Sequence, residues 1–155
     1  MITLKQANRI IETIVKRGAE LNCRPLSVVV VEPGCVVKAF QKEDGSSMVR
    51  FEMAFGKAYA SLALGRSSKL VRIRNEEKPA FMNYLFNATD DKIFPEGGGM
   101  LIRAGNGDVV GAVGVTGDTE DRDEELAAYG IRAAGFKTDE DCADMGRSIN
   151  VRQTK

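Results

Sequence analysis

The sequence predicts a single compact domain that combines helices with β-hairpins. Two patterns indicate this class. Segments with apolar residues at helical spacing alternate with β-branched runs, and those runs flank short turns rich in glycine and proline. The length agrees, because 155 residues with 43% hydrophobic side chains suit one core.

The first helix is expected from Leu4 to Glu20. Thr3 and Gln6 have the spacing of a capping box, in which each side chain bonds the backbone N–H of the other residue. The apolar side chains that would face the core recur at helical spacing: Ala7, Ile10, Ile11, Ile14 and Val15.

A β-hairpin is expected next. The runs Ser27 to Val31 and Cys35 to Phe40 flank Glu32-Pro33-Gly34, which is a turn signal. Four consecutive valines predict a strand that is covered on both faces. We therefore expect a central strand, with helices or a partner subunit against it.

A second helix is expected from about Met48 to Leu64, with Gly65 at its end. The preceding turn, Asp44-Gly45-Ser46-Ser47, places two serines where either could cap the helix. Shorter helices are expected at Ser68 to Glu77 and at Ala80 to Phe86, on either side of a proline.

The segment from Phe94 to Gly130 holds nine of the sixteen glycines. Ile93-Phe94 and Met100 to Arg103 have strand character, and Asp108 to Val115 resumes it after a Gly-Asn-Gly turn. This segment is therefore expected to be mainly a hairpin. From Thr119 the pattern becomes helical, with acidic residues in the first turns, where they favour the positive end of the helix dipole.

Composition excludes several classes of function. The chain has no histidine, so it cannot supply a Ser-His-Asp relay, a histidine zinc site or a histidine ligand to haem. Cys23, Cys35 and Cys142 are far apart and lack Cys-x-x-Cys spacing, which favours buried thiols in a reducing compartment over a metal or redox site. We expect no metal site.

Charge and hydropathy limit the partners. The 22 basic and 22 acidic residues cancel, so neither nucleic acid nor an anionic membrane is expected to bind. No apolar run approaches the ~18 residues that span a bilayer, and the first segment is amphipathic and charged. A cytoplasmic protein is the simplest interpretation. Residues 137–155 form a polar tail that we expect to dock on the domain of residues 1–136 or on a neighbouring subunit.

Nucleotide-binding motifs fail. Gly105-Asn106-Gly107 continues into a strand rather than a helix, so it does not match the dinucleotide fingerprint. Gly56-Lys57 lacks the earlier glycine of a phosphate loop, because Phe51 stands there.

Two loops are candidates for ligand contact. The backbone N–H groups of Gly97, Gly98 and Gly99 suit a carboxylate or carbonyl oxygen, although a β-bulge or a tight strand entry would also explain these glycines. Thr116, Gly117, Asp118 and Thr119 lie where a strand gives way to a helix N-terminus, a place for anion capture or for simple capping.

One helix adds two basic candidates. Lys57 lies on a small and apolar helical face, and Arg50 is two turns earlier on a similar side. A semi-buried lysine can bind an anion or act as a base, and a snorkelling lysine is the alternative.

The chain resembles the GlcG/HbpS-like family, which includes the C-terminal domain of PduO-type proteins. The resemblance rests on "KAYASLALGR", "FPEGGGMLIR" and "GDVVGAVGVTGDTEDRDEELAAYGI", and it covers about Ile2 to Phe136. It implies a single domain of the α/β (α+β) class, in which helices flank a central antiparallel sheet of about five strands. It also implies a homo-oligomer, dimer or larger. Some members are described as binding haem or corrinoid-related ligands. Without histidine, only methionine, cysteine, tyrosine or lysine could bind the iron here, so we predict no cofactor.

The family's recurring positions fall on Asp44-Gly45, Lys57, Gly97-Gly98-Gly99, Gly114, Gly117, Asp123 and Glu124. Together with the local sequence patterns, these positions predict one pocket. It is formed by Lys57, by Gly97-Gly98-Gly99 (the glycine loop) and by the turn from Thr116 to Glu124.

Three functions stay open. The first is a small-molecule binding protein, accessory to a catabolic pathway, that holds an anionic or carbonyl-bearing ligand. Its predicted ligand contacts are Asp44, Arg50, Lys57, Gly97, Gly98, Gly99, Thr116, Gly117, Thr119, Asp123 and Glu124. The second is a cofactor-independent isomerase, lyase or hydratase acting on a small oxo- or hydroxy-acid, in which Lys57, Glu96 or Asp118 moves the proton and glycine amides stabilise the oxyanion. The third is haem or tetrapyrrole binding through a non-histidine contact.

Overall fold

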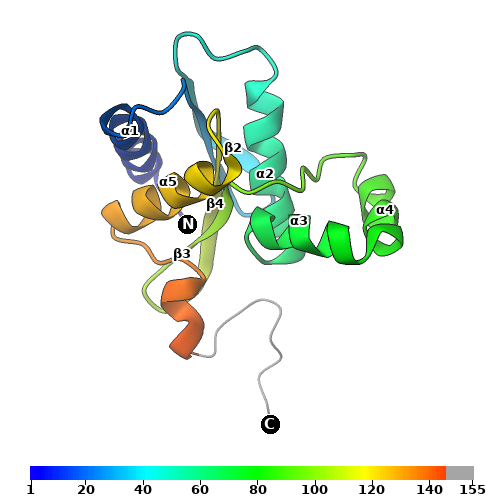
Figure 1. Ribbon diagram of the computed structural model, residues 1–155. Helices are drawn as coiled ribbons and strands as arrows, with labels where there is room; N and C mark the ends of the chain where they lie inside the picture. The colour runs from blue at the N-terminus through cyan, green and yellow to red at the C-terminus, as the bar shows by residue number, and fades with distance from the viewer. Residues whose placement is uncertain (146–155) are drawn as a thin grey trace.

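A four-stranded antiparallel sheet lies between two helical layers (Figure 1). The computed structural model describes residues 1–145, and the last part of the predicted tail, residues 146–155, lies outside the described residues. The strands are β1 (Ser27–Glu32), β2 (Val36–Lys42), β3 (Gly99–Arg103) and β4 (Val109–Thr116), in the order β2-β1-β4-β3. The predicted class is confirmed, with one strand fewer than expected.

The strand expected at Ile93 and Phe94 is absent. The backbone N–H of Phe94 donates to the carbonyl of Gly56 at 3.1 Å. This segment therefore bonds to a helix rather than to the sheet, and the sequence expectation was wrong here.

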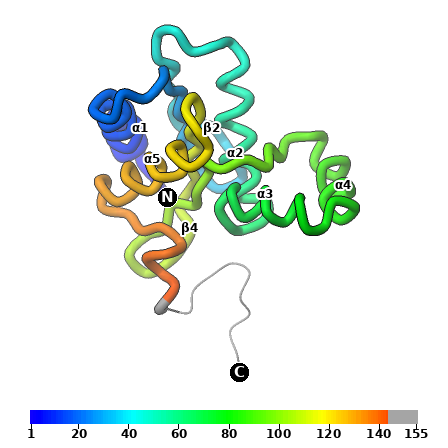
Figure 2. Tube along the Cα trace, viewed as in Figure 1, coloured from blue at the N-terminus to red at the C-terminus, as the bar shows by residue number. Residues whose placement is uncertain are grey.

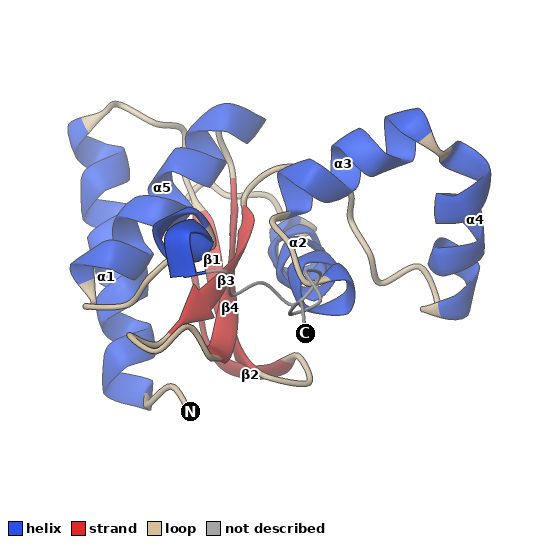
Figure 3. Cartoon of the chain, turned by 90° about the horizontal axis from the view of Figure 1, so that it is seen from below, coloured by secondary structure: helices blue, strands red, loops and turns tan. Residues whose placement is uncertain are grey.

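The helices divide between the two faces of the sheet (Figure 3). On one face lie α1 (Leu4–Glu20) and α5 (Glu120–Ala133), which run side by side in Figure 2. The other face is covered by α2 (Arg50–Leu64), and α3 (Ser68–Glu77) and α4 (Pro79–Ala88) project from that side.

The valine run of β1 explains this three-layer arrangement. Val28 and Val30 pack into the cluster under α1 and α5, whereas Val29 and Val31 pack against α2. Successive side chains of a strand point to opposite faces, so each layer receives alternate valines. All four are fully buried, which confirms the predicted central strand.

Local signals fix several helix ends. The Thr3 hydroxyl accepts from Gln6 N at 3.1 Å and the Gln6 side chain accepts from Thr3 N at 2.9 Å, so the predicted capping box is present. Gly65 ends α2 in the left-handed region, with φ of 68°. The predicted serine cap of α2 is wrong, because Ser46 instead donates to the carbonyl of Leu26 at 3.3 Å.

Glycine lets α2 lie close to the sheet. A Cβ on Gly114 of β4 would stand 2.0 Å from the carbonyl oxygen of Ala54 in α2. Any side chain at this position would push the helix away from the strand.

The segment after α5 returns to the sheet edge. Arg103 of β3 and Lys137 exchange backbone hydrogen bonds of 2.9 and 2.8 Å, and a 3-10 helix, η1 (Glu140–Met145), follows. None of the helices in residues 1–145 is long and apolar enough to cross a membrane.

Candidate functional site

The centre of the predicted site is a buried lysine. Lys57 of α2 is 0% exposed, and its Nζ donates to the carbonyl of Val115 at 2.9 Å. The same nitrogen lies 3.2 Å from Asp123 Oδ2 and 3.4 Å from Glu96 Oε1. A buried charge is tolerated when it is paired and hydrogen-bonded, and this ammonium group meets both conditions.

Asp123 is the principal partner of Lys57. It lies in the first turn of α5, is 1% exposed, and accepts a second bond from the backbone N–H of Asp118 at 3.1 Å. Burial raises the pKa of Asp123, while the charge of Lys57 opposes that shift. The pair thus joins α2, on one face of the sheet, to α5 on the other.

The glycine loop is pressed against this pair. Gly98 has φ of 126°, and a Cβ there would lie 2.3 Å from the carbonyl oxygen of Val115 and 3.0 Å from Lys57 Nζ. Only glycine fits this conformation and this space. The structure therefore brings Lys57, the glycine loop and the turn before α5 together.

Protein side chains already occupy two amides of this loop. The N–H of Gly97 donates to Glu120 Oε1 at 2.7 Å, and the N–H of Gly99 donates to Ser68 Oγ at 2.8 Å. The carboxylate of Glu120 thus occupies the position that the sequence predicted for a ligand carboxylate. Arg72 holds it there through a bond of 2.7 Å from Nε.

The other predicted residues lie around this centre in different roles. Arg50 donates to the Thr116 hydroxyl at 2.8 Å. Thr119 caps α5 by accepting from Arg122 N at 3.2 Å, which is the capping alternative. Gly117 has φ of 138° and lies against the backbone of Pro25.

Two predicted acidic residues lie nearer the solvent. Asp118 pairs with Arg24 at 3.2 Å. Partial burial tends to raise the pKa of Asp118, but hydrogen bonds from Arg24 and from the Thr119 backbone outweigh this and lower it. Asp44 lies in the exposed loop before α2.

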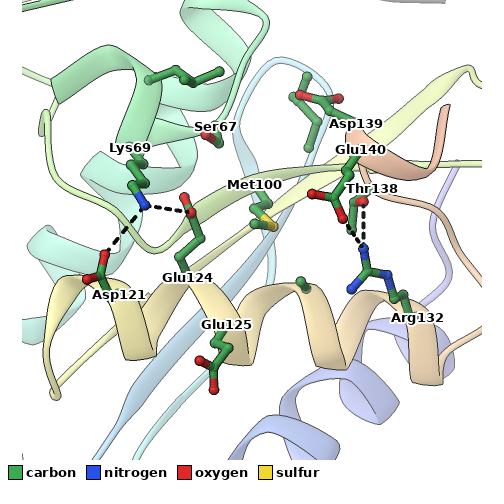
Figure 4. Close-up of a pocket in the computed structure, with 13 residues that line it drawn as sticks. Ser67, Lys69, Met100, Asp121, Glu124, Glu125, Arg132, Thr138, Asp139 and Glu140 are labelled. Carbon is green, nitrogen blue, oxygen red and sulfur yellow. Dashed lines mark hydrogen bonds and ion pairs between the residues drawn. The ribbon is translucent and has the colours of Figure 1, made fainter. Parts of the chain in front are cut away.

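A groove of about 760 Å³ lies beside this centre, between α3, β3, α5 and η1 (Figure 4). Of the predicted residues, only Glu124 lines it. Its apolar lining consists of Leu70, Met100, Leu101 and Ala128. Its charged lining consists of Lys69, Asp121, Glu124, Glu125, Arg132, Asp139 and Glu140.

The two basic residues of the groove are already engaged. Lys69 lies 3.5 Å from Asp121 and 3.9 Å from Glu124, and Arg132 lies 3.3 Å from Glu140 (Figure 4). Among the lining residues within positions 1–145, carboxylates outnumber the basic groups, so this part of the groove wall carries a net negative charge.

Glu124 is the least satisfied group in this groove. Its side chain is 20% exposed, and its Oε1 atom is buried without a hydrogen-bond partner among the described residues. Burial raises the pKa of Glu124, and the charge of Lys69 opposes the shift. Such a carboxyl can accept a hydrogen bond when ionised and donate one when protonated.

The sequence contained a partial signal for this groove. Asp121, Glu125, Ala128 and Arg132 recur at helical spacing along one face of α5. That face is neither apolar nor directed at the main core. The facing residues come from α3, β3 and η1, which are distant in sequence, so spacing could not bring them together.

The residues in positions 1–145 include no group of three or more His, Cys, Asp or Glu side chains that could hold a metal ion.

Comparison with known proteins gives one family and one fold. The family model described as haem degrading protein HbpS-like matches residues 2–132. A Citrobacter freundii relative, described as an uncharacterized 15.0 kDa protein in the dhaT-dhaS intergenic region, is 29% identical over 127 residues. The match covers 81% of this chain and 87% of the relative.

Solved structures share the fold at low sequence identity. Klebsiella pneumoniae ORFY has a TM-score of 0.78 at 23% identity, covering 86% of this chain and 90% of its own. A PduOC–haem complex has a TM-score of 0.79 at 20% identity, covering 88% and 97%. A double mutant of Streptomyces reticuli HbpS has a TM-score of 0.72 at 22% identity, covering 84% and 85%. Because the family model spans nearly the whole domain, the chain belongs to the HbpS-like family.

Proposed function

We propose that this chain is a small-molecule binding protein whose ligand lies in the groove between α3, β3, α5 and η1. The observation that carries the proposal is the buried, unpartnered Oε1 atom of Glu124 in a groove of about 760 Å³. An unpaired buried polar atom costs free energy, and a ligand that bonds to it removes that cost. The volume falls within the range of small-molecule sites.

The lining indicates the class of ligand. Leu70, Met100, Leu101 and Ala128 suit an apolar body. Glu124 suits a carbonyl group when it is protonated, and a hydroxyl or ammonium group when it is ionised. The excess of carboxylates disfavours a ligand with several negative charges. We therefore retain the carbonyl-bearing part of the prediction for this groove, and not the anionic part.

The family description and the PduOC–haem complex both name haem, which makes haem a second candidate ligand. Haem nevertheless fits the lining of the groove poorly. The chain has no histidine, and of the methionine, cysteine, tyrosine and lysine side chains considered above, the lining within residues 1–145 offers the iron only Met100 and Lys69. The haem propionates would face walls with more carboxylates than basic groups.

The Lys57 centre supports the groove rather than binding the ligand in this proposal. Asp123 and Glu124 are neighbours on α5, where Asp123 is held by Lys57 and Glu124 lines the groove. Because the two residues are consecutive, the ion pair that holds Asp123 also holds the backbone of Glu124. Catalysis by Lys57, Glu96 or Asp118, an accessory role in a catabolic pathway and a homo-oligomeric state all stay predictions.

The test is thermal stabilisation and calorimetric titration with a panel of apolar compounds. The panel carries a ketone, an amide, an amine or two carboxylates, and haemin is added as a separate arm. We expect ketones, amides or amines to bind in the groove, and we expect no dicarboxylate binding that Ala128→Trp abolishes. Ala128→Trp fills the groove and should abolish binding, whereas Ala88→Trp, the same change at an exposed position of α4, should leave it unchanged.

Two results would overturn the proposal. One is ligand binding that survives Ala128→Trp, which would move the site elsewhere. The other is a Soret band with haemin that Met100→Leu removes, which would make haem the ligand.

A further inference from the structure

A second concavity, of about 150 Å³, is lined by Leu64, Arg66, Arg74 and Phe81. These residues come from the end of α2, the segment after it, α3 and α4. Within residues 1–145 it shares no lining residue with the groove, so what it binds does not depend on the function proposed above.

The charge of this concavity is opposite to that of the groove. Two guanidinium groups line it, and no carboxylate from residues 1–145 does. Neither Arg66 nor Arg74 forms an ion pair within residues 1–145, whereas Arg72, Arg103 and Arg132 each have a carboxylate partner. The positive charge of the pair is therefore not neutralised locally.

Arg66 also carries an unmet hydrogen-bond requirement. Its Nε atom is buried and has no partner among the described residues. Leaving a buried charged donor unpaired is costly, so a retained group of this kind calls for an acceptor. The C-terminal end of α2 lies nearby, and its negative end opposes an anion, so the arginines must supply the attraction.

The aromatic wall adds a second type of contact. The guanidinium carbon of Arg74 lies 5.6 Å from the centre of the Phe81 ring, which holds this side chain over the ring. Phe81 is 46% exposed, so part of its surface is open to a ligand.

We propose that this concavity is an oxoanion site, in which Arg66 and Arg74 bind the carboxylate or phosphate group of a small molecule. Arginine forks bind such groups with two parallel hydrogen bonds. Leu64 and Phe81 contact the apolar part of the ligand. The volume suits one oxoanion with a small substituent, and not a tetrapyrrole.

The test is calorimetric titration of the full chain with inorganic phosphate, phenyl phosphate and benzoate. Phenyl phosphate or benzoate should bind more tightly than inorganic phosphate because of the aromatic wall. Whichever of the two binds more tightly shows whether the site prefers a phosphate or a carboxylate group. Arg66→Gln and Arg74→Gln should each weaken binding by about tenfold. Lys78→Gln removes the same charge from an exposed residue between α3 and α4 and should change binding less than twofold.

Further variants keep the test decisive. Arg66→Lys retains the charge but not the fork and should also weaken binding, even where Arg66→Gln fails to fold. Ala128→Trp should bind these probes as the wild type does, which separates this site from the groove. Absence of binding by all three probes, or an equal loss in Lys78→Gln, would overturn the proposal.

Discussion

Lys57 Nζ lies 3.2 Å from Asp123 Oδ2, and the two side chains are 0% and 1% exposed. The two residues come from helices on opposite faces of the sheet. They meet at the end of β4, where the Val115 carbonyl accepts the third hydrogen bond of the cluster. A cation with this many partners holds the layers together and has little remaining capacity for an external anion.

Lys57→Met should destabilise the fold strongly. It leaves the Asp123 carboxylate buried without its cation, which typically costs about 3–5 kcal/mol of the free energy of unfolding. Adding Asp123→Asn should recover part of the loss, because the uncompensated charge is gone. Urea unfolding measures both. Lys69→Met removes a lysine that is 37% exposed and should cost less than about 1 kcal/mol. Equal losses in the two single variants would contradict the structural role of Lys57.

Gly98→Ala should destabilise by about 2 kcal/mol or more, because the added Cβ meets backbone and the φ of 126° is unfavourable. Gly105→Ala is the matched control, since a Cβ there has no atom within 4 Å. It should change stability by less than about 1 kcal/mol. Thermal and urea unfolding of the two variants compare them. A tolerated alanine at position 98 would mean that the loop is not held against Lys57.

Glu124→Gln should stabilise the unliganded protein at neutral pH. Burial raises the folded-state pKa of Glu124 above its ordinary value of 4.5, so the folded state binds the proton more tightly than the unfolded state. This contribution is fully present below pH 4.5 and is lost as the pH rises through the folded pKa. The advantage of the Gln variant should therefore shrink on acidification. A melting-temperature series across pH for the two proteins tests this, and an advantage that grows at low pH would contradict it.

Glu120→Ala should create a small anion site at the glycine loop. The variant frees the N–H of Gly97 and leaves Arg72 beside it, at the cost of about 1–2 kcal/mol for the lost hydrogen bonds. Formate should restore part of the melting temperature of the variant and leave the wild type unchanged. Sodium chloride at equal ionic strength is the control. If formate and sodium chloride raise the melting temperature of the variant equally, the idea that the Glu120 carboxylate occupies an anion site in this loop is contradicted.

The sequence predicted best where structure is set by near neighbours. The start of α1 follows from the Thr3–Gln6 capping box, and the end of α2 follows from Gly65. The valine run of β1 predicted burial on both faces, because side chains of a strand alternate between its faces and all four valines are apolar. Such signals need only a few consecutive residues.

Features that depend on contacts between distant segments were not predictable in this way. The strand expected at Ile93 and Phe94 bonds instead to Gly56 of α2, a partner that no local pattern specifies. Spacing placed Lys57 on a small and apolar face but did not show that Asp123 would neutralise it. The same limit hid the carboxylate of Glu120 in the glycine loop.

The central pairing of the sheet has a consequence for biosynthesis. β1 is made early, but it is completed by β4, where Val28 pairs with Val115. The hairpin of β1 and β2 therefore leaves the ribosome with its valines exposed and the free edge of β1 unpaired. Both stay uncovered until most of the chain, including β4, has been synthesised. A nascent chain stalled before Val109 offers this edge to other polypeptides, so chaperone capture during translation should be strongest in that interval.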